Sequence, residues 1–200
     1  MEKLIFATGN EGKMKEARMI LADLGYEIQS MKEAGINVDI VEDGQTFEEN
    51  ALIKARAISK ETGCLVLADD SGLEVDYMDK APGIYSARFL GEDTSYRVIN
   101  QYIIDQLAGV PDSERTARFV CAIAAVFPDG SEYTRRGTIE GIIGYEERGE
   151  NGFGYDPIFY LPELGKTTAE LDPEEKNQIS HRGNALRLMK KVIKTHIENK

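Results

Sequence analysis

The chain has 200 residues, of which 42% are hydrophobic, and its formal net charge is -11. This length suits one sizeable domain, here residues 1–200, or two lobes that share a core, and the hydrophobic share is enough to fill that core. The acidic balance argues against nucleic acid or an anionic membrane as a partner, because both attract clustered lysines and arginines. A small anion can still bind where cations are concentrated, with or without a divalent metal.

Localisation and redox state follow from two further patterns. The apolar stretches are far shorter than the roughly 20 residues of a membrane-spanning helix, and the start MEKLIF carries no secretory pattern. We therefore expect a soluble, cytoplasmic protein. Cys64 and Cys121 both lie in apolar runs, which favours buried, reduced thiols over a disulfide or a metal site.

The first part of the chain alternates buried strands with helices. Apolar runs indicate the strands, apolar residues at helical spacing indicate the helices, and Gly25 ends the first helix. The expected elements are the strand 4–7, the helix 14–24, the strand 26–31, an extended piece 36–41, the helix 47–58 and the strand 64–68. The last run is typical of a parallel strand, and it ends in Asp69-Asp70-Ser71-Gly72.

The second part predicts a hairpin and two closing helices. The expected elements are a half-exposed strand 73–77, a turn at Pro82-Gly83, the helix 94–107, the paired strands 115–127 and 131–143, the strand 158–161, a short helix opened by Asp172-Pro173 and a longer helix bearing Ala185, Leu188 and Val192. Together these elements predict an α/β fold with a mixed sheet and helices on its faces.

The stretch TGNEGK lies between the first strand and the first helix. Gly9 and Gly12 allow a ligand close to the backbone, the helix N-terminus carries partial positive charge, and Lys13 adds a full one. These are parts of a phosphate site, although the spacing is not that of a Walker A loop. The alternative is that Asn10 only caps the helix and Lys13 is a solvated first-turn residue.

The stretch LADDSG places two acids and a hydroxyl where a buried strand emerges, and ligand sites in open α/β sheets favour such strand ends. Adjacent strand residues point to opposite faces, so Asp69 and Asp70 should play different parts. One can hold a metal while the other braces the turn. The alternative is an Asx turn followed by Gly72.

Acids gather again in VEDGQTFEEN. Thr46 and Glu49 fit a capping box in which Glu49 reaches back to the Thr46 amide. Glu42 has no such structural task, which makes it the metal candidate here, since Mg²⁺ prefers a few carboxylates together with waters and substrate phosphates. The His and Cys spacings do not support zinc.

Two later stretches bear aromatic and cationic groups. In GENGFGYDP, glycines flank Phe153 and Tyr155, whose rings either stack on a planar base or merely pack the loop. In EEKNQISHRG, Lys176, His181 and Arg182 can donate to carbonyl or phosphate oxygens, or serve as ordinary surface and capping residues.

Taken together and in this order, these stretches resemble the inosine triphosphate pyrophosphatase family. The resemblance rests on ATGNEGK, EDGQTFEENALIKA, LADDSGLEVD, APGIYSARF, GFGYDPIF and EEKNQISHRG, and it covers nearly the whole chain. It implies an elongated mixed-sheet α/β fold with two lobes around a substrate cleft, and a homodimer. It also implies Mg²⁺-dependent hydrolysis of ITP, dITP and XTP to the nucleoside monophosphate and pyrophosphate.

The resemblance also implies roles for individual residues. The triphosphate would be bound by Thr8, Gly9, Asn10, Glu11, Gly12 and Lys13. Asp70 would be the metal ligand and proton acceptor, Glu42 the second metal ligand, and Ser71 a substrate contact. The base and sugar would be framed by Phe153, Gly154, Tyr155 and Asp156, with further substrate contacts from Lys176, His181 and Arg182.

Two rival functions stay open. A nucleotide pyrophosphatase of the related Maf type would act on modified pyrimidines, but the SHR and FGYD motifs argue against it. A non-catalytic nucleotide-binding module would hold its ligand without cleaving it. Acids beside a phosphate loop disfavour that reading, because carboxylates repel phosphates unless a metal intervenes.

Overall fold

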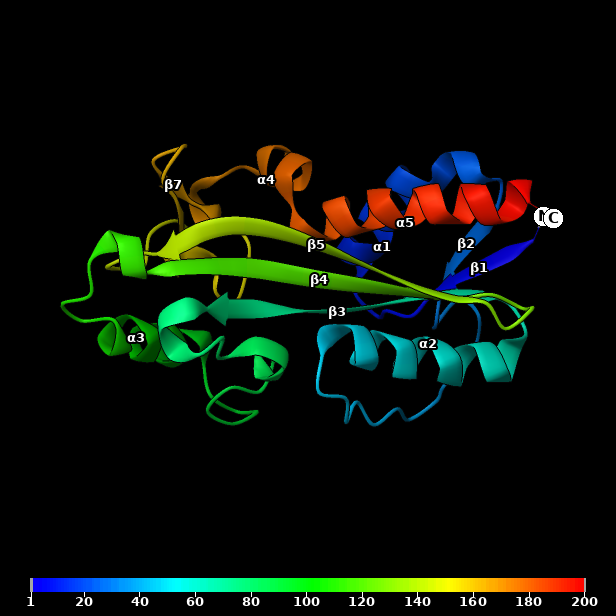
Figure 1. Ribbon diagram of the computed structural model, residues 1–200, viewed down its shortest axis with the longest axis horizontal. Helices are drawn as coiled ribbons and strands as arrows, with labels where there is room; N and C mark the ends of the chain where they lie inside the picture. The colour runs from blue at the N-terminus through cyan, green and yellow to red at the C-terminus, as the bar shows by residue number, and fades with distance from the viewer. Residues whose placement is uncertain (1, 200) are drawn as a thin grey trace. The chain divides into compact units, whose positions relative to one another are not determined.

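The computed structural model describes residues 2–199 and has an α/β fold (Figure 1). Within those residues, five α-helices accompany a mixed sheet with the strand order β2-β1-β3-β4-β5-β6-β7. The chain divides into two compact units. Unit 1 comprises residues 1–70, 121–137 and 181–200, and unit 2 comprises residues 71–120 and 138–180. The prediction of a single domain over residues 1–200 stays a prediction.

The sheet of unit 1 is built around β1 (Lys3–Phe6). This strand pairs in parallel with β2 (Glu27–Ser30) and with β3 (Leu65–Val75), so the parallel arrangement predicted for the apolar run before Asp69 is confirmed. Next in the strand order come β4 (Thr116–Val126) and β5 (Glu132–Ile143), the two strands of the expected hairpin.

The helices of unit 1 cover both faces of its sheet, because side chains along a strand alternate between faces. Leu4 and Phe6 pack with α1 (Glu11–Leu21) and α5 (His181–Glu198), which also contact each other. Ile5 and Ala7 pack instead with α2 (Phe47–Thr62). Figure 1 shows α2 on the face opposite α1 and α5.

Unit 2 has its own core. Leu73 and Val75 of β3 and Phe119 of β4 pack with α3 (Tyr96–Gln106) and with β6 (Phe159–Leu161). The unit also contains the short strand β7 (Lys166–Thr167) and α4 (Pro173–Ile179), whose start is fixed by a capping box between Asp172 and Glu175. The predicted opening of this helix at Asp172-Pro173 is therefore confirmed.

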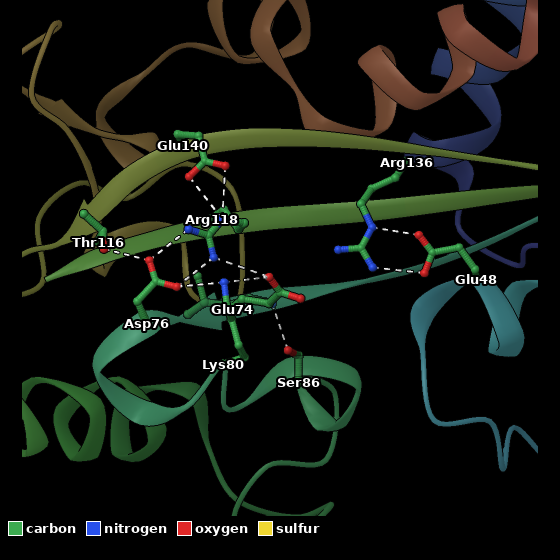
Figure 2. Close-up of polar contacts among 10 residues, drawn as sticks. Glu48, Glu74, Asp76, Lys80, Ser86, Thr116, Arg118, Arg136 and Glu140 are labelled. Carbon is green, nitrogen blue, oxygen red and sulfur yellow. Dashed lines mark hydrogen bonds and ion pairs between the residues drawn. The ribbon is translucent and has the colours of Figure 1, made fainter. Parts of the chain in front are cut away.

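Charged side chains tie elements together within each unit (Figure 2). In unit 2, Arg118 donates to Asp76 and to Glu140 over 2.9–3.1 Å. In unit 1, Arg136 of β5 donates to both carboxylate oxygens of Glu48 over 2.7 and 3.0 Å. Such bidentate pairs fix direction as well as distance, and this one holds the first turn of α2 to the sheet.

The structure corrects several predicted details. The strand predicted to stop at residue 68 continues to Val75, so Asp69, Asp70 and Ser71 lie in a strand and not in an Asx turn. A local pattern could not reveal this, because the change from buried to half-buried positions mimics a strand end. The first helix starts earlier, at Glu11, and β7 was not predicted. Glu49 accepts from the amide of Gln45, not from that of Thr46.

The structure can be compared with two expectations drawn from composition, one about membrane-spanning helices and one about the cysteines. Within residues 2–199, the helices are all too short or too polar to span a bilayer. Cys64 and Cys121 are both free thiols, as expected, but only Cys121 is buried. The prediction of a buried thiol at residue 64 was wrong, because this residue precedes β3 and remains partly exposed.

Candidate active site

The phosphate-loop candidate of unit 1 runs from Thr8 into the first turn of α1. Asn10 caps the helix, since its side chain accepts from the amide of Lys13 over 3.0 Å, and Thr8 accepts from the amide of Asn10 over 3.1 Å. The amides of Glu11 and Gly12 belong to the first turn, where N–H groups have no intrahelical partner. The segment therefore presents donors at the positive end of a helix.

Lys13 is not the solvated residue that the capping alternative supposed. Its ammonium group donates to Asp69 over 2.8 Å, and Asp69 is only 3% exposed. Burial works to raise the pKa of this carboxyl group, but the charges of Lys13 and Arg182 outweigh it and lower the pKa to about 2. Asp69 is thus ionised at neutral pH and holds two cations in place.

Asp70 lies in the opposite situation on the other face of β3. Burial raises the pKa of its carboxyl group to about 6, against the effect of a hydrogen bond from Asn50 and with a further increase from the charge of Glu42. The amide nitrogen of Asn50 donates to Asp70 over 3.1 Å. A carboxylate with a pKa near neutrality is suited to accept a proton from water.

Glu42 lies close to this carboxylate, but it is engaged. Its carboxylate pairs with Lys54 over 2.8 Å, and Lys54 also donates to the backbone carbonyl of Asp69 over 2.9 Å. The sequence reasoning did not foresee this ion pair. The loop position of Glu42 hid the partner, because Lys54 comes from the second turn of α2.

The donor set of this cluster fits a hard divalent cation. Glu42 raises the pKa of Asp70, so the two acids repel each other, and a cation near both would relieve that repulsion. Within residues 2–199, no three His, Cys, Asp or Glu side chains are grouped so that they could hold a metal alone. Mg²⁺ commonly binds through one or two carboxylates with waters and substrate phosphates, which this arrangement would allow.

The start of α5 brings two predicted donors into unit 1. Gly137 of β5 permits this position, because a Cβ there would lie 2.2 Å from the carbonyl oxygen of His181. Arg182 follows with a side chain only 13% exposed, 3.6 Å from Glu16 and from Asp69. Its buried Nε has no hydrogen-bond partner within residues 2–199. The charges of Glu16 and Asp69 therefore hold Arg182 in place.

The predicted aromatic loop belongs to unit 2. Asp156 anchors it, as it is 3% exposed and accepts from the Phe153 amide over 2.9 Å, from Lys176 over 2.6 Å and from Thr168 over 2.8 Å. Gly152 is required at the base of the loop, because its φ is +74° and a Cβ would lie 2.2 Å from Asp156.

The two aromatic residues of this loop differ sharply. Tyr155 is buried, donates its hydroxyl to the carbonyl of Ser86 over 2.6 Å and packs edge-to-face on Tyr96. The packing alternative is therefore confirmed for Tyr155. Phe153 is 69% exposed, so much of its ring remains accessible, and the Lys176 ammonium lies over the ring, 5.4 Å from its centre.

Sequence reasoning missed Asn50 and Lys54 on α2. Asn50 is 2% exposed although it is polar, and the two residues lie four apart, beside the buried Ala51 and Ala55. A polar i, i+4 pair bordering an apolar helical stripe was the available signal. Ser71 follows Asp70 in β3 and is half-buried.

Comparison with known proteins decides the family. Residues 4–192 match the model described as the Ham1 family. The chain belongs to the Ham1 family. The predicted resemblance to the inosine triphosphate pyrophosphatase family is thereby confirmed. Among curated Ham1-type relatives, the protein of Exiguobacterium sibiricum, named dITP/XTP pyrophosphatase, is 48% identical over 98% of each chain.

Solved Ham1 proteins share the fold. The Staphylococcus aureus Ham1 protein has a TM-score of 0.89 at 41% identity, covering 98% of this chain and 100% of the other. A HAM1 protein from Coxiella burnetii has a TM-score of 0.90 at 42% identity, with the same coverage. The predicted α/β fold with a mixed sheet is confirmed.

Proposed function

We propose that this Ham1 chain hydrolyses non-standard purine nucleoside triphosphates, namely ITP, dITP and XTP, to the nucleoside monophosphate and pyrophosphate. The observation that carries the proposal is the polar cluster of unit 1, in which Asp70 has a pKa of about 6 close to the cation-holding Asp69. The chain is 48% identical to a relative named dITP/XTP pyrophosphatase. Removal of such nucleotides from the pool implies a cytoplasmic location.

We assign the triphosphate to the start of α1. The residues concerned are Thr8, Gly9, Asn10, Glu11, Gly12 and Lys13, where first-turn amides and one ammonium group face a developing negative charge. Lys13 is held by Asp69, so it needs no reorganisation when the phosphates arrive. Ser71, next to Asp70 in β3, is assigned a substrate contact.

We assign the proton acceptor role to Asp70. Water that attacks the α-phosphorus must lose a proton and must be oriented, and a carboxylate with a pKa of about 6 can do both near neutral pH. Glu42 and Asp70 would hold Mg²⁺, which when bound neutralises charge on the phosphate oxygens and on the leaving pyrophosphate. Lys54 pairs with Glu42, so on cation binding it would either move aside or share the Glu42 carboxylate with the cation.

We assign base recognition to donors and to an accessible ring. Inosine and xanthosine present an oxygen at the purine 6-position, whereas adenosine presents an amino group that would leave the donors Arg182 and His181 unpaired. A site built on such bonds can discriminate by a factor of about 10⁴. Phe153, 69% exposed, would stack on the base, with Gly154 and Tyr155 shaping the loop.

Lys176 and Asp156 support that loop. Their ion pair of 2.6 Å links α4 to the segment that carries Phe153, so Lys176 would contact substrate from a fixed position. Asp156 already accepts three hydrogen bonds, and we therefore assign it to holding the loop in the frame of the sugar.

We also propose a homodimer. Tyr77, Tyr85 and Val98 of unit 2 are each more than half exposed, and exposed large apolar side chains are candidates for burial in an interface. Light scattering coupled to gel filtration would give a mass near 45 kDa, twice the 22.3 kDa of one chain. A mass of one chain at micromolar concentration would contradict the dimer.

A product assay tests the function. The chain is incubated with Mg²⁺ and with the triphosphates of inosine, deoxyinosine, xanthosine, guanosine, adenosine and thymidine, and pyrophosphate and orthophosphate are measured separately. We expect pyrophosphate from the first three. Cleavage of the pyrimidine triphosphate instead would favour the Maf-type alternative, and tight binding without turnover would favour a binding module.

A further inference from the structure

We propose that Asn50 is a positioning residue for the reaction. Its carboxamide joins the Asp70 carboxylate to the backbone of the loop that carries Glu42, so that one side chain sets the geometry of both acids. Only the predicted effect of Asn50 on kcat rests on the proposed function. The predicted effect of Asn50 on cation affinity does not, because cation binding can be measured without substrate.

The contacts of Asn50 use both ends of its carboxamide. The nitrogen donates to Asp70 over 3.1 Å, and the oxygen accepts from the amide of Gly44 over 2.8 Å. The residue is 2% exposed, so water does not compete for either bond. Asn50 is the only buried polar residue of α2, whose other buried positions are Phe47, Ala51, Ala55 and Ile58.

The absence of a side chain at Gly44 leaves room for the carboxamide of Asn50. A Cβ at Gly44 would lie 2.7 Å from the Oδ1 of Asn50, 2.8 Å from the Cβ of Glu49 and 3.0 Å from the amide nitrogen of Asn50. Real Cβ atoms do not approach so closely, so any other residue would push the loop away from α2. Because Glu42 is two residues from Gly44, such a shift would also move this carboxylate.

The backbone of Asn50 is itself held in place. Glu48, two residues before Asn50, is held to β5 by the two bonds from Arg136 (Figure 2). The carboxamide therefore projects from a fixed helical turn. A ligand supported by a fixed hydrogen bond keeps the orientation that cation binding and proton transfer need.

The first experiment measures cation affinity in the free protein. Mn²⁺ binding, followed by electron paramagnetic resonance, is compared for the wild type and for Asn50→Ala, Asn50→Asp and Gly44→Ala. We expect Asn50→Ala and Gly44→Ala each to weaken binding about tenfold or more, the usual cost of losing support for a ligand. Asn50→Asp keeps an oxygen that can accept from the Gly44 amide but loses the N–H that donates to Asp70. This variant therefore separates the contribution of one hydrogen bond from that of the other.

The second readout is kinetic. With ITP and saturating Mg²⁺, Asn50→Ala should lower kcat by about 10²-fold while KM changes little, because a small misplacement of a reacting group costs rate more than substrate binding. The double variant Asn50→Ala/Gly44→Ala should be no worse than the stronger single variant, since both disturb one link.

Thr46→Ala is the matched control. It removes the side chain that caps α2 by accepting from the amide of Glu49 over 3.1 Å, and this side chain takes no part in the link between Asp70, Asn50 and Gly44. The variant should therefore lower Tm by a few degrees and leave Mn²⁺ affinity and kcat within about twofold of wild type.

Three results would overturn the inference. They are wild-type Mn²⁺ affinity and kcat in Asn50→Ala, losses in Thr46→Ala that match those in Asn50→Ala, and losses that simply add in the double variant. If the wild type released no pyrophosphate, the proposed function would fail, and Mn²⁺ affinity alone would decide the role of Asn50.

Discussion

Substitution of Asp70 by asparagine should stabilise the free protein while it abolishes turnover. The carboxyl group of Asp70 has its pKa raised from 3.8 to about 6, mainly by burial. A raised pKa means that the folded state binds the proton more tightly than the unfolded state does. The contribution to stability is therefore complete below pH 4 and is lost as the pH rises through 6. At pH 8 the ionised group is a net cost to the fold.

The size of this cost follows from the pKa. Each tenfold difference in proton affinity between the folded and unfolded states corresponds to about 1.36 kcal/mol. A pKa raised from 3.8 to about 6 therefore lowers the free energy of unfolding by about 3 kcal/mol when the group is ionised. Asp70→Asn removes the charge and keeps the size of the side chain, and its carboxamide oxygen can accept from Asn50. We expect the variant to exceed the wild type in free energy of unfolding by up to about 3 kcal/mol at pH 8 and by nearly nothing at pH 4.

Urea unfolding at pH 4, 6 and 8 with a chelator present measures this difference. The control Asp39→Asn removes an exposed carboxylate and should show no such pH-dependent gain. Added Mg²⁺ should then stabilise the wild type and not Asp70→Asn, and kcat should fall by orders of magnitude in the variant. A variant that is less stable than wild type at pH 8, or that keeps its activity, would refute the assignment of a desolvated catalytic carboxylate.

Three further predictions concern both units. Phe153→Ala should lower kcat/KM for ITP by about 5- to 100-fold, the range expected for loss of one base-stacking contact. Tm should not change, because the ring is exposed, and unchanged kinetics would exclude stacking. Arg118→Ala should cost about 2 kcal/mol at pH 7, since Asp76 and Glu140 lose their shared cation. This cost should persist at pH 4 and decline only below it, because the Arg118 guanidinium holds the pKa of Asp76 well below its usual range; a cost already lost at pH 4 in urea titrations would contradict the pairing. Lys13→Ala should raise KM for triphosphates at least tenfold, and equal KM values would remove Lys13 from the phosphate site.

The fold was largely readable from the sequence because its signals are local. Helix starts depend on caps, and both the cap at Asn10 and the Asp172-Pro173 opening lie within one turn of the helices they start. The β4–β5 hairpin was readable for the same reason, since its strands are adjacent in sequence.

The site was less predictable because its contacts join distant residues. Lys13 and Asp69 are separated by 56 positions, and Asn50 and Asp70 by 20, so no local pattern records either contact. The motif stretches supplied Lys13, Asp70 and Glu42 as candidates, but burial decided which acid is ionised and which has a raised pKa. Lys54, which binds Glu42, was overlooked for the same reason.

Turnover of ITP in ¹⁸O-labelled water tests the central claim most directly. If water attacks the α-phosphorus, mass spectrometry of the products will find one ¹⁸O in inosine monophosphate and none in pyrophosphate. Label in pyrophosphate would indicate attack at the β-phosphorus, and release of orthophosphate would indicate a different reaction. Either result would contradict the account of Asp70 as the group that activates water for attack on the α-phosphorus.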